Sequence, residues 1–257
     1  MTRPLVIAHR GASAHAPENT LAAFQMALDG GSEGVEFDVR LARDRVPVVI
    51  HDETLRRTAR RPERIADFTS KQLSKTDVGS WFNRKFPRKD RPEYADQTVP
   101  PLKQVLKLLK DFSGLIYIEL KASENDYRPL SAAVCNEIRD SPLLPQMIVK
   151  SFKLGVIPEV RHRLPQVQTA ALFAPEIMHY LRRREHIISL AREFGAHQLS
   201  VHYSLITPRL CKLAAEAKMP LTVWTVADPK WLARCRRLGI KALITNDPAR
   251  LLATRNL

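Results

Sequence analysis

The chain has 257 residues, 44% hydrophobic content and a formal net charge of +14. This length and hydrophobic content suit one large α/β domain with a sizeable core, or two small domains. The chain lacks a run of about 18 apolar residues, so no transmembrane segment is expected.

The cysteines and the charged residues narrow the class of protein further. The three cysteines are far apart and form no CxxC pair, which argues against a disulfide framework or a cysteine metal site. Residues 1–4 lead into only four apolar residues before His9, which is unlike a signal peptide. We therefore expect a cytoplasmic protein. The basic residues form several separate clusters, so we interpret the charge as a basic solvated surface and expect no nucleic-acid partner.

Short apolar runs rich in Val, Ile and Leu alternate with helix-like segments along most of the chain. Such runs are typical of strands buried on both faces of a parallel sheet. The predicted strands are residues 5–9, 35–39, 48–51, 115–120, 147–152, 169–173, 198–202, 221–226 and 242–245. The predicted helices are residues 20–28, 102–110, 129–139, 177–194, 208–217, 229–238 and 248–252. Repeated strand–helix units favour an α/β fold of the TIM (β/α)8 barrel type over an open doubly wound sheet.

Two segments depart from this strand–helix rhythm. The connection "RLARDRVP" between the second and third runs is too short for a crossover helix, so we expect the third run to return as a hairpin. The segment 53–100 is rich in polar and charged residues and also contains aromatic residues, and it is too long for an ordinary βα loop. We interpret it as an inserted cap segment at the barrel mouth, within a single domain of residues 1–257.

An acidic pair lies on the second predicted strand. Glu36 and Asp38 are two residues apart, so their side chains share one face of the strand. Two buried carboxylates need a cation or a proton to neutralise them, and a divalent ion with oxygen ligands provides this. The alternative is a pair of solvated carboxylates on an edge strand.

Other polar residues stand at the ends of apolar strands. His9 and Arg10 follow the first strand, His51 ends the third, and Glu119 and Lys121 end the fourth. Two histidines in such positions can form an acid–base pair for phosphoester chemistry. Barrel active sites lie at the carboxyl ends of the strands, so these residues predict one polar pocket that suits a phosphodiester and a divalent ion.

The motifs that carry these residues resemble one family. "HRG" with "PENT", "EFDV…VPVVIHDE", "IELK", the Ser151-Phe152 pair, "VWTV" and "LITNDPA" are similar to the glycerophosphodiester phosphodiesterase family. These are phosphodiesterases of the phospholipase C-like TIM-barrel type. The resemblance runs from His9 to about Ala249.

The resemblance implies a reaction and a role for each residue. The substrates would be small-molecule glycerophosphodiesters, the deacylated remains of phospholipids, and the products glycerol 3-phosphate and an alcohol. Glu36, Asp38 and Glu119 would bind one divalent cation, Mg or Ca. His9 and His51 would be the catalytic acid–base pair. The phosphate would contact Arg10 and Lys121, and Trp224 would line the glycerol pocket.

Two departures and two alternatives accompany this interpretation. Arg45 stands where the family usually has glycine in the hairpin, and Asn246 stands between Thr245 and Asp247 where an aspartate is usual. One alternative is a lysophospholipase D-type phosphodiesterase, which would need an apolar groove at the mouth. The non-enzyme alternative is an inactive barrel that binds anionic polymers or surfaces through its positive charge. The sequence does not predict the oligomeric state.

Overall fold

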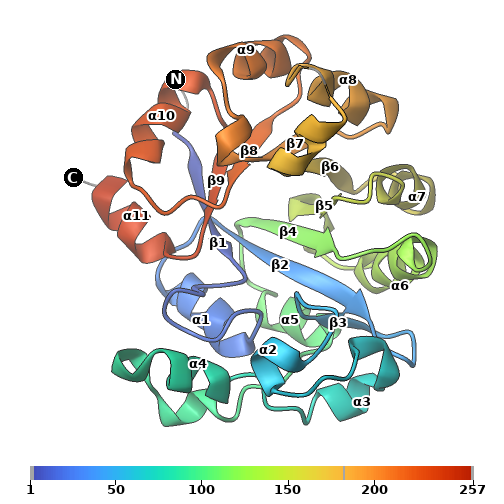
Figure 1. Ribbon diagram of the computed structural model, residues 1–257, viewed down its shortest axis with the longest axis vertical. Coiled ribbons are helices and arrows are strands. Elements are labelled where there is room, and N and C mark those ends of the chain that lie inside the picture. The colour runs from blue at the N-terminus through green and yellow to red at the C-terminus, as the bar shows by residue number, and fades with distance from the viewer. Residues whose placement is uncertain (1–2, 182, 256–257) are drawn as a thin grey trace.

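The computed structural model describes residues 3–181 and 183–255 and shows a closed barrel surrounded by helices (Figure 1). Eight parallel strands follow the order β1-β9-β8-β7-β6-β5-β4-β2, and pairing between β1 and β2 closes the ring. These strands are β1 (Leu5–His9), β2 (Gly34–Leu41), β4 (Leu115–Leu120), β5 (Met147–Ser151), β6 (Gln168–Phe173), β7 (Gln198–His202), β8 (Leu221–Trp224) and β9 (Ala242–Thr245). The predicted TIM barrel is thus confirmed.

The third predicted strand forms a hairpin, as expected. β3 (Pro47–Val49) pairs antiparallel with the end of β2, with Val39 opposite Val49. Arg45, in the turn, adopts a φ of +64°, the left-handed conformation that glycine adopts more readily. The hairpin therefore keeps its turn geometry with arginine in place of glycine.

The longer helices pack on the outside of the barrel. They are α1 (Leu21–Asp29), α5 (Leu102–Leu108), α6 (Tyr127–Ile138), α7 (Val156–Arg163), α8 (His186–Glu193), α9 (Pro208–Glu216), α10 (Lys230–Leu238) and α11 (Pro248–Arg255). The core between barrel and helices falls into two large apolar clusters. Inside the barrel, the hydroxyl of the buried Tyr117 hydrogen-bonds Thr222 Oγ1 at 3.1 Å.

One predicted helix was wrong, and outside residues 53–100 one observed helix was not predicted. The segment 177–194 contains the 3₁₀ helix η5 (Pro175–His179) and the separate helix α8. Only α8 carries a helical apolar pattern, since Ile187, Ile188 and Ala191 are its buried residues. Helix α7 was not predicted; its proline, Pro158, lies in the first turn, where proline is tolerated.

Residues 53–101 connect β3 to α5 through short helical segments. These are α2 (Arg56–Ala59), η1 (Ile65–Asp67), α3 (Ser70–Leu73), α4 (Ser80–Lys85), η2 (Pro87–Lys89) and η3 (Pro92–Tyr94). Figure 1 shows α2, α3 and α4 beside α1, α5 and β3, at one edge of the barrel. Phe82 and Tyr94 are buried and pack edge to face, and the Tyr94 hydroxyl donates to the His15 carbonyl at 2.9 Å. The aromatic residues of this segment thus anchor it on the first loop of the barrel.

Two further 3₁₀ helices lie in the connections of the barrel. The 3₁₀ helix η4 (Leu144–Gln146) precedes β5, and η6 (Tyr203–Leu205) follows β7. In the part of the chain that the structure describes, no helix has both the length and the apolar content needed to cross a bilayer.

Candidate active site

The acidic residues of two neighbouring strands meet inside the mouth of the barrel. Glu36 and Asp38 lie on β2, and the strand register places Asp38 opposite Glu119 of β4. All three carboxylates are buried, and one oxygen of each lies within 4.8 Å of the others. The predicted three-carboxylate cluster is therefore present in the structure.

Basic side chains neutralise this cluster. The Lys150 ammonium lies 2.8 Å from Glu36 Oε1 and 3.8 Å from Glu119 Oε2. Lys121 contacts Glu119 and lies 3.2 Å from Asp38 Oδ1. Lys150, only 2% exposed, was not predicted as a site residue. Its signal in the sequence is a single lysine within the apolar strand "MIVKS", where a charge has to be paired if it points inward.

The carboxylates also have oxygens suited to a cation. Glu36 Oε1, Asp38 Oδ1 and Glu119 Oε1 are buried and accept no well-aligned hydrogen bond, although lysine ammonium groups lie close by. Burial raises the pKa of Glu119, and the nearby Asp38 charge adds to this increase. Burial also favours the protonated form of Asp38, but Arg10 and Lys121 outweigh it and hold the pKa of Asp38 below its usual range. A set of oxygen donors with unsatisfied lone pairs fits a hard divalent cation such as Mg or Ca.

The turn after β1 directs two adjacent residues to the same site. His9 Nε2 lies 3.8 Å from Glu36 Oε2, and Arg10 Nε lies 3.0 Å from Asp38 Oδ2. On a regular strand these side chains would point to opposite faces. Arg10 has a φ of +56° and Gly11 a φ of +81°, which breaks the alternation. A Cβ on Gly11 would lie 2.5 Å from the backbone of Ala23, so only glycine fits this turn.

Each candidate histidine has its Nδ1 atom held by an oxygen. His9 Nδ1 lies 2.6 Å from Asn246 Oδ1, and His51 Nδ1 lies 2.7 Å from Asp52 Oδ1. An oxygen acceptor at Nδ1 places the proton there and leaves Nε2 for the reaction. Burial lowers the pKa of His9, which keeps its imidazole neutral at pH 7. Asn246, noted in the sequence only as a departure from the family motif, thus contacts a site residue.

A chain of ion pairs links His51 to Arg10. Asp52 accepts a hydrogen bond from Arg57 Nε at 2.6 Å, and Arg57 donates two bonds to Glu18 at 2.7 and 2.8 Å. Glu18 in turn accepts from Arg10 Nη1 at 2.8 Å. The sequence indicated Glu18 only through the "PENT" motif, and Arg57 only as part of a basic cluster. The same motif supplies Asn19, whose Nδ2 donates to Asp38 Oδ2 at 2.9 Å.

Aromatic residues line the opposite side of the mouth. Trp224, at the end of β8, packs edge to face with Phe152 at 5.5 Å and with His202 at 5.1 Å between ring centroids. Trp224 Nε1 is buried and has no hydrogen-bond partner among the described residues. Lys121 lies 5.6 Å from the centre of the Phe152 ring, which connects this aromatic wall to the carboxylate cluster.

Comparisons with known proteins show which family the chain belongs to. The model of the glycerophosphoryl diester phosphodiesterase family matches residues 9–250. A glycerophosphodiester phosphodiesterase of Caldanaerobacter subterraneus subsp. tengcongensis is 32% identical over 250 residues, which cover 97% of each chain. A solved structure of the glycerophosphodiester phosphodiesterase from Thermotoga maritima is 26% identical, with a TM-score of 0.76 and coverage of 99% of this chain and 100% of that one.

A second solved structure has the same fold. It is an Oleispira antarctica phosphodiesterase in complex with sn-glycerol-3-phosphate, with a TM-score of 0.86 at 24% identity. The alignment covers 99% of this chain and 98% of that one.

Proposed function

The chain belongs to the glycerophosphoryl diester phosphodiesterase family, and on this premise we propose that it hydrolyses glycerophosphodiesters to glycerol 3-phosphate and an alcohol. The observation that carries the proposal is the buried cluster of Glu36, Asp38 and Glu119 beside two histidines whose Nδ1 atoms are both held. The sn-glycerol-3-phosphate complex of the Oleispira antarctica relative supports the choice of substrate class.

The three carboxylates would hold one divalent cation, Mg or Ca. When bound, such an ion polarises a phosphoryl oxygen as a Lewis acid. Arg10 and Lys121 flank the same carboxylates and would contact the remaining phosphate oxygens. Their positive charges stabilise the negative charge that develops on the phosphate in the transition state.

His9 and His51 would share the proton transfers. One Nε2 accepts the proton of the attacking hydroxyl, which belongs to water or to the glycerol 2-position, and the other donates a proton to the leaving alcohol. The neutral state of His9 at pH 7 suits it to accept a proton. The carboxylate of Asp52 orients His51 and stabilises its imidazolium form.

Release of glycerol 3-phosphate from several glycerophosphodiesters, with Mg²⁺ or Ca²⁺ and with EDTA, tests the proposal. The His9→Ala and His51→Ala variants are each expected to lose about 10²- to 10⁴-fold in kcat. The exposed His162 on α7 provides a matched control, because His162→Ala removes an imidazole far from the carboxylates. Full activity after thorough chelation would contradict the metal assignment, and full activity of His9→Ala would contradict the acid–base assignment.

The lysophospholipase D alternative receives less support from the site. The cavity beside Glu119 and Lys121 is lined mainly by charged and polar side chains, whereas an acyl chain needs an apolar groove. Equal or faster turnover of lysophosphatidylcholine than of glycerophosphocholine would favour this alternative.

The proposal treats residues 1–257 as one domain with an insertion at about 53–100. Within it, Arg57 and Asp52 connect the insertion to the site. We place the enzyme in the cytoplasm, a proposal supported by the three buried free thiols of Cys135, Cys211 and Cys235.

A further inference from the structure

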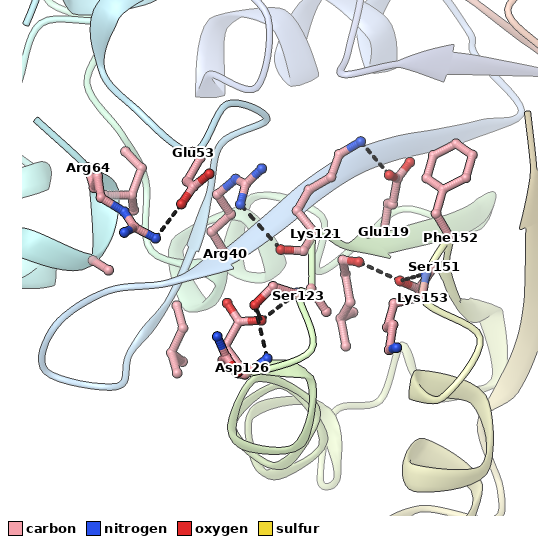
Figure 2. A pocket seen from close by; sticks show the side chains of 16 residues that line it. Arg40, Glu53, Arg64, Glu119, Lys121, Ser123, Asp126, Ser151, Phe152 and Lys153 are labelled. Carbon is pink, nitrogen blue, oxygen red and sulfur yellow. Dashed lines mark hydrogen bonds and ion pairs between the residues drawn. The ribbon is translucent and has the colours of Figure 1, made fainter. Parts of the chain in front are cut away.

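A cavity of about 400 Å³ lies beside Glu119 and Lys121 (Figure 2). Its walls come from the end of β2, from η1 of the insertion, and from the loops after β4 and β5. Because it shares Glu119 and Lys121 with the carboxylate cluster, a group in this cavity would adjoin a phosphate held at the cluster.

Most cations around this cavity already have a carboxylate partner. Arg64 pairs with Glu53, Lys153 pairs with Glu124, and Lys121 contacts Glu119. These pairs neutralise the positive charges that face the cavity.

Arg40 is different, since it forms no ion pair with any described residue. It extends from the same face of β2 as Asp38 and lies between Glu53 and Lys121 (Figure 2). Its Nε donates to the His51 carbonyl at 2.8 Å, and its Nη1 donates to the Lys121 carbonyl at 3.3 Å. These two bonds fix the guanidinium plane, and Nη2 has no hydrogen-bond partner among residues 3–181 and 183–255.

The carboxylates around Arg40 are bound by other donors. Asp126 accepts from the Ser123 backbone N–H and hydroxyl, at 2.5 and 2.8 Å. Asp38 is held by Arg10 and Lys121. A half-buried guanidinium held only by backbone carbonyls therefore keeps Nη2 and the second N–H of Nη1 available for an anion that enters the cavity.

We propose that this cavity binds the head group of the glycerophosphodiester and that Arg40 selects head groups bearing a carboxylate. The inference rests on the proposed function, because it requires the phosphate to lie at the carboxylate cluster. The glycerol carbons would pack on the aromatic wall of Phe152 and Trp224, so the head group extends toward Arg40. The planar guanidinium matches the two oxygens of a carboxylate, whereas the trimethylammonium of choline would place a second cation beside it.

Two substrates isolate the carboxylate. Glycerophosphoserine and glycerophosphoethanolamine share the glycerol, the phosphodiester and the ammonium, and differ only in the serine carboxylate. A charge-assisted hydrogen bond in a half-buried site predicts that kcat/KM for the serine substrate exceeds that for the ethanolamine substrate about 10- to 100-fold. This comparison uses the unaltered protein, so it does not depend on the folding of a variant.

Two variants then assign the selectivity to Arg40. Arg40→Gln is expected to bring the serine-to-ethanolamine ratio of kcat/KM close to one, mainly by lowering the serine value. Arg43→Gln is the matched control, because Arg43 is exposed on the same hairpin and should leave the ratio as in the unaltered protein.

Each outcome of the experiment is informative. A ratio near one in the unaltered protein would overturn the inference while leaving the proposed function intact. Equal losses for both substrates in Arg40→Gln would also overturn it, because Arg40 would then act on a group that both substrates share, or through the His51 carbonyl that it holds. No turnover of any glycerophosphodiester would overturn the proposed function and the head-group site together.

Discussion

Lys150 is the residue whose replacement tests the charge balance of the site most directly. Lys150→Met keeps a long, flexible side chain but removes the positive charge that lies 2.8 Å from the buried Glu36. Removing one partner of a buried ion pair costs about 3–5 kcal/mol, because the other charge stays buried without compensation. A chain of this size loses roughly 2–4 °C in Tm per kcal/mol, so the variant should melt about 6–20 °C lower in EDTA.

Thermal unfolding with and without divalent cation is the assay. A cation bound by the carboxylates would replace the missing positive charge, and a ligand at 100 times its Kd adds about 2.7 kcal/mol of stability. In the unaltered protein a bound cation would compete with the Lys150 ammonium for Glu36 and Glu119. Added Mg²⁺ or Ca²⁺ should therefore raise the Tm of Lys150→Met more than that of the unaltered protein.

The exposed Lys103 on α5 supplies the control for this prediction. Lys103→Met removes the same charge from the surface and should change neither the Tm in EDTA nor the metal-induced increase appreciably. If Lys150→Met melts within about 2 °C of the unaltered protein in EDTA, the ion pair does not have the assumed cost. If its metal-induced increase is the smaller one, the ammonium and the cation do not compete for these oxygens.

Three further predictions test the surroundings of the site and the fold. Asp52→Asn should lower kcat about 10- to 100-fold with little change in KM, since it weakens the orientation of His51; an unchanged kcat would remove Asp52 from the proton-transfer mechanism. Arg45→Gly should raise the Tm by about 2–4 °C by relieving the positive φ, whereas Arg43→Gly on the same hairpin should not raise it. Burial raises the pKa of Tyr117 to about 12, whereas the pKa of tyrosine in the unfolded chain is about 10. The contribution of Tyr117 to the free energy of unfolding is therefore fully present below pH 10 and should be lost between pH 10 and 12. From pH 10 to 12 the free energy of unfolding of Tyr117→Phe should fall less steeply than that of the unaltered protein, by about 1 kcal/mol per pH unit. An equally steep fall in both proteins would contradict this account.

The strands were predictable because the barrel buries them on both faces. The ranges 5–9, 115–120, 198–202 and 242–245 match the observed strands, because the polar residues on either side of each apolar run mark where the strand begins and ends. Helix 177–194 was wrong because Ile177 lies in a separate 3₁₀ turn, whose packing depends on contacts remote in sequence. Contacts between residues remote in sequence cannot be predicted from the apolar residues of this segment alone.

The candidate site was predictable where alternate residues of a strand share one face. Glu36 and Asp38 lie on the same face of β2, and Asp38 lies opposite Glu119 on the neighbouring parallel strand β4. Lys150 was missed because a single lysine in the apolar strand "MIVKS" does not reveal which face of the strand it occupies. Its partners, Glu36 and Glu119, lie on other strands of the barrel. Asn246 was missed because its contact with His9 joins the first and last strands of the ring.

The ion-pair chain explains why residues 53–100 matter to a site built on the barrel. His51 follows the short strand β3, which lies outside the ring, so the barrel alone does not fix its imidazole. Arg57 of the insertion binds both Asp52 and Glu18, and this connects His51 to the loop that positions Arg10. Arg57 thus connects, through Asp52 and Glu18, the two residues proposed for acid–base catalysis and phosphate binding, His51 and Arg10. Residues 53–100 therefore contribute to the geometry of the candidate site through Arg57, in addition to the wall that Ile65 and Ala66 add to the neighbouring cavity.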